Sequence, residues 1–249
     1  MYGFGIDIGG SGIKGALVDL SQGCLVGERF RIPTPQPATP AAVLETVKTL
    51  LTHFQWTGPV GIGLPSAVPG GVAKTAAHID DGWMGLPVEQ HFSQMLGTPV
   101  TVLNDADAAG IAEVKFGCGR NVPGTVMMLT LGTGIGSALF VDGVLVPNLE
   151  LGHMEVDGVE AEIRASSNTR KNEGLSWVEW AERLNLVLEA YQRLFWPDLF
   201  ILGGGVSKKH EKFFPLLKVD TQLAVARLQN HAGIIGAAFS SQQRQLTHA

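Results

Sequence analysis

Two glycine-rich turns, each between two apolar segments, constrain this chain more than any other feature. The first lies at residues 9–12 and the second at residues 132–134, with an apolar stretch on both sides of each. Glycine lets the backbone reach positive φ and turn its N–H groups toward an anion. One such turn alone fits an ordinary hairpin equally well, but two in one chain predict a pair of phosphate loops that face each other across a cleft.

The small and cationic residues of these loops are the expected phosphate ligands. They are Gly9, Gly10, Ser11, Gly12 and Lys14 in the first loop, and Gly132, Thr133 and Gly134 in the second. Asp7 comes just before the first turn, and its carboxylate is a hard ligand that would hold Mg²⁺, here through water. A later apolar segment ends in Gly203, Gly204 and Gly205. A nucleotide or polyphosphate would fit over this tripeptide, but so would a plain C-terminal loop.

Composition limits the classes of protein open to this chain. With 249 residues, 45% of them hydrophobic and 16% charged, it is long and apolar enough for a globular fold with a sizeable core. With a net charge of −5, the chain has no overall positive field that would attract nucleic acid or an acidic membrane. A polyanionic substrate would therefore need a local basic patch. The two cysteines, Cys24 and Cys118, indicate no disulfide framework, which favours a reducing cytoplasm.

A stretch without charge at residues 121–141 is long enough to span a bilayer. Its glycines cluster in the middle, however, and this arrangement favours two buried strands joined by a turn. We therefore expect no membrane span. We also expect no signal peptide, because Asp7 interrupts the N-terminal apolar stretch.

The order of expected elements repeats within the chain. Strands are predicted at 4–8, 13–20, 24–32, 60–64, 100–103, 125–131, 135–141, 144–146 and 199–202. Helices are predicted at 40–54, with Thr39 as N-cap, and at 88–96, 106–116, 177–196 and 232–239. A unit of strand, turn, strand and strand, followed by helix and strand, thus occurs twice, which indicates a duplicated α/β fold. We expect one domain at 1–110 and a second at 111–231, with a C-terminal helix at about 232–249 that packs back on the first.

Two pairs of polar residues are candidates for chemistry. Asn104 and Asp105 stand where an apolar strand meets a helix, and ligands of open α/β sheets collect beyond the carboxyl ends of strands. Asp105 is thus a candidate general base for a hydroxyl and Asn104 a candidate ligand of a neighbouring one, although helix capping explains both equally well. Glu150 and His153 would share a face in a helical turn and could grip adjacent hydroxyls. An exposed pair in a loop is the alternative, and metal binding is weaker because no cysteine or second histidine is close.

Together these motifs resemble the ROK family of sugar kinases, within the actin-like ATPase superfamily. The resemblance extends over nearly the whole chain. It is carried by the first loop through Lys14, residues 103–108 and 131–136, and the Glu150-x-Gly-His153 motif, in that order. Residues 34–40, 147–156 and 196–200 look more specifically like the polyphosphate glucokinase branch of the family.

The resemblance implies two ribonuclease-H-like domains that close on glucose, with Mg²⁺, usually in a homodimer. Asp105 is similar to the family's catalytic base, which takes the proton of the 6-hydroxyl as its oxygen attacks the terminal phosphoryl group. Asn104, Glu150 and His153 are similar to sugar ligands. The Glu162-x-x-Ala-Ser context resembles that of a third acidic ligand, so Glu162 joins this set.

The chain departs from the family pattern in two places. No cysteine lies between His153 and Glu162, where the family has a cysteine-rich zinc loop, so zinc is not expected. The loop at residues 78–83 also differs from the usual sugar-kinase pattern, and no ligand is assigned in it.

The expected activity is therefore transfer of a phosphoryl group from polyphosphate to glucose, with ATP as a second candidate donor. A strictly ATP-dependent glucokinase and a mannose-accepting relative are the nearest alternatives. A sugar-responsive regulator of the same family is a less favoured alternative, because it would need a DNA-binding domain before the strand that is expected to start at Phe4. A filament-forming relative of actin is a third alternative, and the expected sugar ligands Glu150, His153 and Glu162 argue against it. Long polyphosphate would need basic residues beyond the loops; the candidates are Arg164, Arg170, Lys171, Lys208, Lys209 and Lys212.

Overall fold

Two sheets with the same strand order divide the chain into two units. The structure is a computed structural model that describes residues 1–76 and 79–247. The first unit combines residues 1–112 with the C-terminal segment from residue 231, and the second spans residues 113–230. His78, at the start of the 78–83 loop, and the last two residues of the expected C-terminal helix lie outside the described residues.

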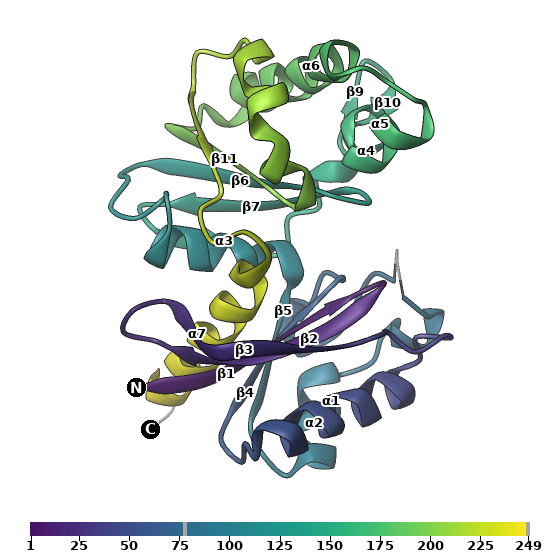
Figure 1. Ribbon diagram of the computed structural model, residues 1–249, viewed down its shortest axis with the longest axis vertical. Helices are drawn as coiled ribbons and strands as arrows, with labels where there is room; N and C mark the ends of the chain where they lie inside the picture. The colour runs from purple at the N-terminus through teal and green to yellow at the C-terminus, as the bar shows by residue number, and fades with distance from the viewer. Residues whose placement is uncertain (77–78, 248–249) are drawn as a thin grey trace. The chain divides into compact units, whose positions relative to one another are not determined.

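The first sheet is mixed and has the order β3-β2-β1-β4-β5. Its strands are β1 (Tyr2–Gly9), β2 (Gly12–Asp19), β3 (Cys24–Ile32), β4 (Val60–Leu64) and β5 (Val100–Asn104). The first three pair antiparallel, β4 pairs parallel with β1, and β5 pairs parallel with β4. Its helices are α1 (Pro40–Phe54), α2 (Val88–Leu96), the beginning of α3 (Asp105–Phe116) and α7 (Ala232–Thr247). In Figure 1, α1 and α2 lie on the opposite side of this sheet from α7.

The second sheet repeats this plan with the order β12-β11-β6-β7-β8. Its strands are β6 (Thr125–Leu131), β7 (Ile135–Val141), β8 (Val144–Val146), β11 (Leu199–Gly203) and β12 (Gln222–Val225). Again three strands pair antiparallel and two run parallel to the first of them. The rest of the unit consists of the β9 (Glu155–Val156) and β10 (Val159–Glu160) hairpin and helices α4 (Ala161–Ala165), α5 (Ser167–Asn172) and α6 (Trp177–Phe195). The duplication in the sequence is thus a duplication of sheet topology.

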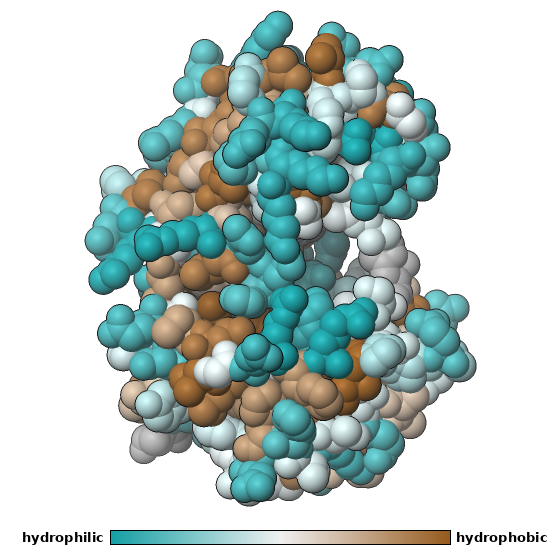
Figure 2. All heavy atoms as spheres, in the orientation of Figure 1, coloured by the Kyte–Doolittle hydropathy of each residue, from teal (hydrophilic) through white to brown (hydrophobic). Residues whose placement is uncertain are grey.

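Each unit has its own hydrophobic core. The largest fully buried side chains are aromatic and come from both units; among them are Phe4, Trp83 and Phe92 in the first, and Trp180, Tyr191 and Phe200 in the second. On the face drawn in Figure 2, hydrophilic side chains and smaller hydrophobic patches alternate over both units. Short 3₁₀ turns at Pro69–Gly71, Asp81–Trp83, Leu151–His153, Gly205–Lys212, Phe214–Leu216 and Gln229–His231 connect the main elements.

Glycines in the first sheet let α7 lie directly on its strands. A Cβ atom at Gly5 would stand 1.9 Å from the carbonyl oxygen of Ile234, and one at Gly61 would stand 1.8 Å from that of Ala237. No side chain other than hydrogen fits at these two strand positions. The last helix of the chain therefore packs against β1 and β4, which are far from it in sequence.

Most of the predicted elements lie within a few residues of their expected bounds. The Thr39 hydroxyl accepts a hydrogen bond from the Ala42 amide, which confirms Thr39 as the N-cap of α1. The uncharged stretch at 121–141 forms β6, a turn and β7, and within the described residues no helix is both long and apolar enough to cross a bilayer. Helix α6 ends at Phe195, one residue earlier than predicted, because Trp196 has a left-handed φ of 45°. The elements that the sequence pattern missed are short: β9, β10, β12, α4 and α5.

Candidate active site

The first glycine-rich loop is the tight turn between β1 and β2, where Gly9 pairs with Gly12. The Lys14 ammonium group lies 2.9 Å from a carboxylate oxygen of Asp7, and both side chains are partly exposed beside the turn. Two residues outside the expected set of phosphate ligands hold the backbone of this loop: Arg31 donates to the Ser11 carbonyl and the Thr34 hydroxyl donates to that of Gly9. The loop is therefore fixed at both ends, with a cation and an anion next to it.

Helix α7 begins beside Asp7. A Cβ atom at Gly233 would stand 3.4 Å from the carboxyl carbon of Asp7, so the first turn of the helix comes close to this side chain. The amino-terminal end of a helix carries a partial positive charge, which favours an anionic group at this position. In the sequence, the trace of this neighbour is Gly233, one of two glycines in the otherwise apolar first half of α7, residues 232–239.

Asn104 and Asp105 stand at the junction of β5 and α3. The Asn104 side-chain oxygen accepts hydrogen bonds from the amides of Ala106 at 2.8 Å and Asp107 at 3.2 Å, so Asn104 caps α3. Its amide nitrogen donates to the Ser66 carbonyl at 3.3 Å. Capping, the alternative that the sequence left open, thus occupies the oxygen of Asn104. Asp105 is the first residue of the helix and is half-buried.

The second loop lies between β6 and β7 and is held by helices α4 and α5. Its Gly132 amide donates to the Gly134 carbonyl, and the Asn168 amide donates to the Gly132 carbonyl, both at 3.0 Å. The Ile135 amide donates to Glu162 at 3.3 Å, and a Cβ atom at Gly134 would stand 2.2 Å from that carboxylate. Any side chain at position 134 would therefore displace the Glu162 carboxylate from the loop.

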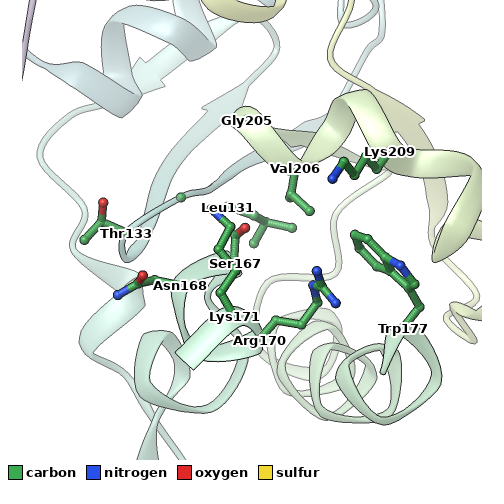
Figure 3. Close-up of a pocket in the computed structure, with 11 residues that line it drawn as sticks. Leu131, Thr133, Ser167, Asn168, Arg170, Lys171, Trp177, Gly205, Val206 and Lys209 are labelled. Carbon is green, nitrogen blue, oxygen red and sulfur yellow. The ribbon is translucent and has the colours of Figure 1, made fainter. Parts of the chain in front are cut away.

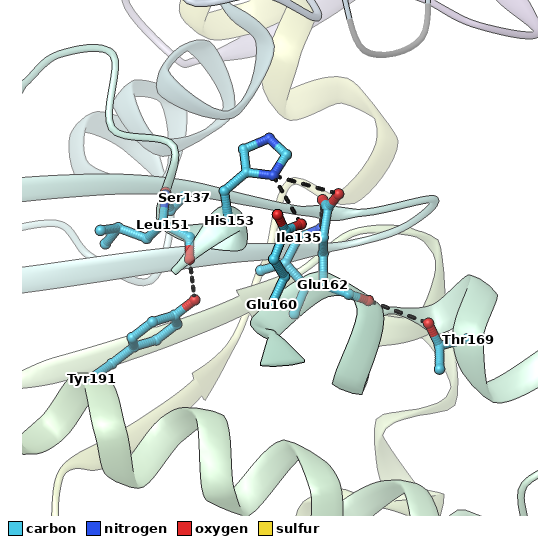
Figure 4. A network of polar contacts seen from close by, with 8 residues as sticks. All are labelled: Ile135, Ser137, Leu151, His153, Glu160, Glu162, Thr169 and Tyr191. Atoms are coloured by element: carbon cyan, nitrogen blue, oxygen red, sulfur yellow. Dashed lines mark hydrogen bonds and ion pairs between the residues drawn. The ribbon is translucent and has the colours of Figure 1, made fainter. Parts of the chain in front are cut away.

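The structure brings Glu150, His153 and Glu162 into one group within the second unit. The Nδ1 atom of His153 lies 3.8 Å from a Glu162 oxygen and 3.2 Å from an oxygen of Glu160, a residue that the sequence interpretation did not single out (Figure 4). The hydrogen bond with Glu160 is the main reason why the pKa of His153 is raised, and the charge of Glu162 adds to it. Partial desolvation raises the pKa of Glu150, which the charge of His153 opposes.

Hydrogen bonds of two buried side chains hold the backbone that carries this group. The Tyr191 hydroxyl donates to the Leu151 carbonyl at 2.7 Å, and the Ser137 hydroxyl donates to the Leu149 carbonyl at 2.8 Å (Figure 4). The Leu151 amide returns a hydrogen bond to Ser137 at 3.1 Å. Tyr191 and Ser137 thus fix the 3₁₀ turn between Glu150 and His153. No local signal in the sequence connects these residues with the turn.

The same group contains the one set of potential metal ligands found in the described part of the chain. One ligand atom each of His153, Glu160 and Glu162 lies within 4.8 Å of the others. Carboxylate and imidazole atoms at this spacing could hold a cation, although the hydrogen bond between His153 and Glu160 already satisfies Nδ1.

A pocket of about 360 Å³ in the second unit adjoins the second glycine-rich loop (Figure 3). We call it the basic pocket, because its lining has three cationic side chains and no carboxylate; the lining residues are Leu131, Gly132, Thr133, Ser167, Asn168, Arg170, Lys171, Trp177, Gly205, Val206 and Lys209. Three of the six expected basic residues are therefore here. Of the others, Arg164 donates to the Val156 carbonyl, and neither Lys208 nor Lys212 is in the lining.

The third glycine-rich segment shapes one wall of the basic pocket. Gly203 ends β11, Gly204 has a φ of 82°, and Gly205 lines the pocket. A Cβ atom at Gly204 would stand 2.4 Å from the Leu131 carbonyl oxygen, so both the conformation and the space require glycine there. This contact joins the third segment to the strand that leads into the second loop.

Comparison with known proteins places these features in a family. Residues 3–169 match the model of the ROK family. The chain is 50% identical over 241 residues to the polyphosphate glucokinase of Mycobacterium tuberculosis (strain CDC 1551 / Oshkosh), which covers 96% of this chain and 91% of that protein. It is also 50% identical over 240 residues to the polyphosphate glucokinase of Mycobacterium leprae (strain TN), covering 96% of this chain and 74% of that protein.

Solved structures agree with this assignment. The inorganic polyphosphate/ATP-glucomannokinase from Arthrobacter sp. strain KM superimposes with a TM-score of 0.94 at 47% identity, covering 98% of this chain and 99% of that one. A ROK family glucokinase from Streptomyces griseus, in complex with glucose and AMPPNP, superimposes with a TM-score of 0.83 at 25% identity, covering 98% of this chain and all of that one (100%). The expected α/β fold with a duplicated sheet is confirmed, and the chain belongs to the ROK family.

Proposed function

We propose that this protein is a polyphosphate glucokinase, which transfers a phosphoryl group from inorganic polyphosphate to the 6-hydroxyl of glucose and accepts ATP as a second donor. The observation that carries the proposal is the 50% identity with polyphosphate glucokinases over 96% of the chain. The grouping of Glu150, His153 and Glu162 beside a glycine-rich loop, with a basic pocket in the same unit, supports it.

Asp105 is the proposed general base. A carboxylate at the end of β5 accepts the proton of the 6-hydroxyl as that oxygen attacks the terminal phosphorus, and the bond from phosphorus to the rest of the donor breaks. The Asn104 cap fixes the start of α3 and so fixes the backbone of Asp105. Little covalent chemistry is needed from the protein beyond this proton transfer, because phosphoryl transfer depends mainly on positioning and charge neutralisation.

Glu150, His153 and Glu162 are the proposed sugar ligands, with Asn104 as a fourth. Because Glu160 engages Nδ1 of His153, the other ring nitrogen is the one left to donate to a sugar hydroxyl. Glu150 and Glu162 supply carboxylate oxygens that accept from hydroxyl groups. A mixed set of acceptors and a charged donor suits adjacent hydroxyls on a pyranose ring.

Mg²⁺ is the proposed cofactor, and the residues present fit it. Asp7 offers a partly exposed carboxylate, the ligand type that Mg²⁺ prefers, and would hold the ion through water. When bound, Mg²⁺ supplies positive charge that neutralises the phosphate oxygens. Lys14 already lies 2.9 Å from Asp7 and would add a second positive charge, and the glycine-rich loops would donate backbone N–H groups.

The basic pocket is the proposed site for the donor. Its three cations stand out in a chain whose net charge is −5, and no carboxylate in the lining offsets them. The pocket begins at Gly132 and Thr133, so a phosphate chain whose end is bound by the second loop would continue toward Arg170 and Lys209.

The proposal is tested by incubating the purified chain with glucose, Mg²⁺ and either long-chain polyphosphate or ATP, and detecting glucose 6-phosphate. We expect product with both donors, none without a donor, and formation about 10²–10⁴-fold slower with Asp105→Asn. Product with ATP alone would favour a strictly ATP-dependent glucokinase. A parallel reaction with mannose determines whether that sugar is accepted. We further propose a homodimer in the cytoplasm, and light scattering after gel filtration tests the dimer.

A further inference from the structure

One aromatic side chain lies among the cations of the basic pocket. Trp177 is partly buried, and its ring lies nearly parallel to that of Phe213, with an angle of 14° and 6.1 Å between centroids. A flat indole ring beside a phosphate loop is the kind of surface on which a purine base stacks. In this chain, the guanidinium carbon of Arg170 lies 3.9 Å from the centroid of that ring, so a cation already covers one face of the indole (Figure 3).

Arg170 is held in this position but keeps unused hydrogen-bonding capacity. One terminal nitrogen donates to the Leu175 carbonyl at 2.9 Å, which fixes the side chain over Trp177. Its Nε–H group is buried and has no hydrogen-bond partner in the described residues. Within residues 1–76 and 79–247, no carboxylate forms an ion pair with it. A fixed guanidinium with spare donors matches the oxygens of a phosphate chain.

We propose that the stack of Arg170 on Trp177 selects the phosphoryl donor, because it offers a guanidinium to a chain of phosphates and denies the covered indole face to a nucleotide base. This inference rests on the proposed function. Polyphosphate binds with Arg170 in place, and Lys209 and Lys171 lie in the same pocket for further phosphates. The base of ATP must either displace Arg170 from the ring or stay outside the pocket, so ATP gains little from Trp177.

Two variants of Arg170 separate the two parts of this proposal. Arg170→Met removes the charge but leaves an unbranched apolar side chain that can still cover the ring. We expect the KM for long-chain polyphosphate to rise about tenfold and the KM for ATP to change by less than about twofold. Arg170→Ala removes the charge and the cover together. We expect the same rise for polyphosphate, but a fall of about threefold or more in the KM for ATP, because the base gains the indole face.

Controls distinguish donor selection from damage to the fold. Arg183→Ala removes another arginine of the second unit, which pairs with Glu173 at 2.7 Å and is not in the lining of the pocket. Both donor KM values should stay at the wild-type level in that variant. In all three variants the KM for glucose should remain near wild type, and the melting temperature identifies a variant that has lost its fold. Arg183→Ala should also keep the wild-type kcat with both donors. Calorimetry with tripolyphosphate and with ADP measures the same selection without turnover.

The outcomes separate this inference from the proposed function. Opposite changes in the two donor KM values for Arg170→Ala support the stack as a selector. A rise of equal size for both donors makes Arg170 a general phosphate ligand and overturns it, as does the absence of any change. A wild-type protein that uses ATP but not polyphosphate contradicts the proposed function instead. In that case a lower KM for ATP in Arg170→Ala still supports the covering of Trp177, and an unchanged one overturns it.

Discussion

Glu160 holds the imidazole of His153: its carboxylate lies 3.2 Å from Nδ1, and both residues are about half exposed. The β9–β10 hairpin carries Glu160 to this position, in the stretch between His153 and Glu162 that has no cysteine. A hydrogen bond that the ring N–H donates to a carboxylate fixes the orientation of the ring and favours its charged form. Glu160 is therefore a positioning residue for the proposed sugar site.

Replacing Glu160 tests this role. Glu160→Gln keeps the shape of the side chain and removes its charge, so His153 is held less firmly; we expect the KM for glucose to rise about tenfold and kcat to change much less. Glu155 is the matched control, since it is exposed and pairs with Glu160 across the hairpin. Glu155→Gln should leave the KM for glucose unaltered. Steady-state kinetics with glucose varied measures both, and equal effects of the two variants would remove Glu160 from this role.

The interaction between His153 and Glu160 should also make the stability of the fold depend on pH. Because the pKa of His153 is raised in the folded protein, mainly by Glu160, the interaction stabilises the fold below the usual histidine pKa of about 6.5. This contribution is lost as the pH rises through the higher folded-state value. The difference in melting temperature between wild type and Glu160→Gln should therefore be largest in mild acid and shrink at alkaline pH. A difference that is independent of pH would contradict the assignment.

Loss of the proposed base should slow turnover strongly and spare sugar binding. Asp105→Asn keeps the size of the side chain but cannot accept the proton, and loss of a general base typically lowers the rate by about 10²–10⁴-fold. We expect kcat to fall by this order while calorimetry still detects glucose. Asp220→Asn, at an exposed position of the second unit, is the control and should be fully active. More than about a tenth of wild-type kcat in Asp105→Asn would exclude the base assignment.

The purified protein should contain no stoichiometric zinc, and its activity should depend on Mg²⁺. The reason is that no cysteine lies between His153 and Glu162 and that Glu160 already binds Nδ1 of His153. Elemental analysis measures the zinc content, and treatment with a chelator followed by Mg²⁺ restores activity if the prediction holds. One tightly bound zinc per chain would assign the group of His153, Glu160 and Glu162 to metal binding instead.

Added salt should weaken the binding of polyphosphate more than the binding of ATP. A polyanion that contacts several cations releases counterions on binding, so its affinity falls steeply with ionic strength, and the slope increases with the number of contacts. The basic pocket offers Arg170, Lys171 and Lys209 beyond the loop. We expect the logarithm of KM for polyphosphate to rise more steeply with the logarithm of salt concentration than that for ATP. Equal slopes for the two donors would mean that polyphosphate makes no additional contacts.

Local sequence determined the strands, the long helices and the positions of the loops. Alternation and apolar runs identify strands such as β1 and β6, and helix α6 carries a capping box formed by Ser176 and Glu179 just before an amphipathic stretch. Glycines at fixed places mark the turns, because backbone conformation there depends on the residue itself. The same local logic placed Asp105 at the end of a strand and the start of a helix, where β5 and α3 meet.

Only the tertiary structure decided which side chains meet. Glu160 reaches His153 through a hairpin of two-residue strands, too short to give a periodic signal, and Arg170 covers Trp177 across the turn between α5 and α6. The sequence does not distinguish Gly204 from its two glycine neighbours. In the structure, a Cβ atom at Gly204 would stand 2.4 Å from the Leu131 carbonyl oxygen, so only glycine fits at this position. Such contacts depend on the packing of separate segments, whereas the periodicity of a sequence reports only on the element in which a residue lies.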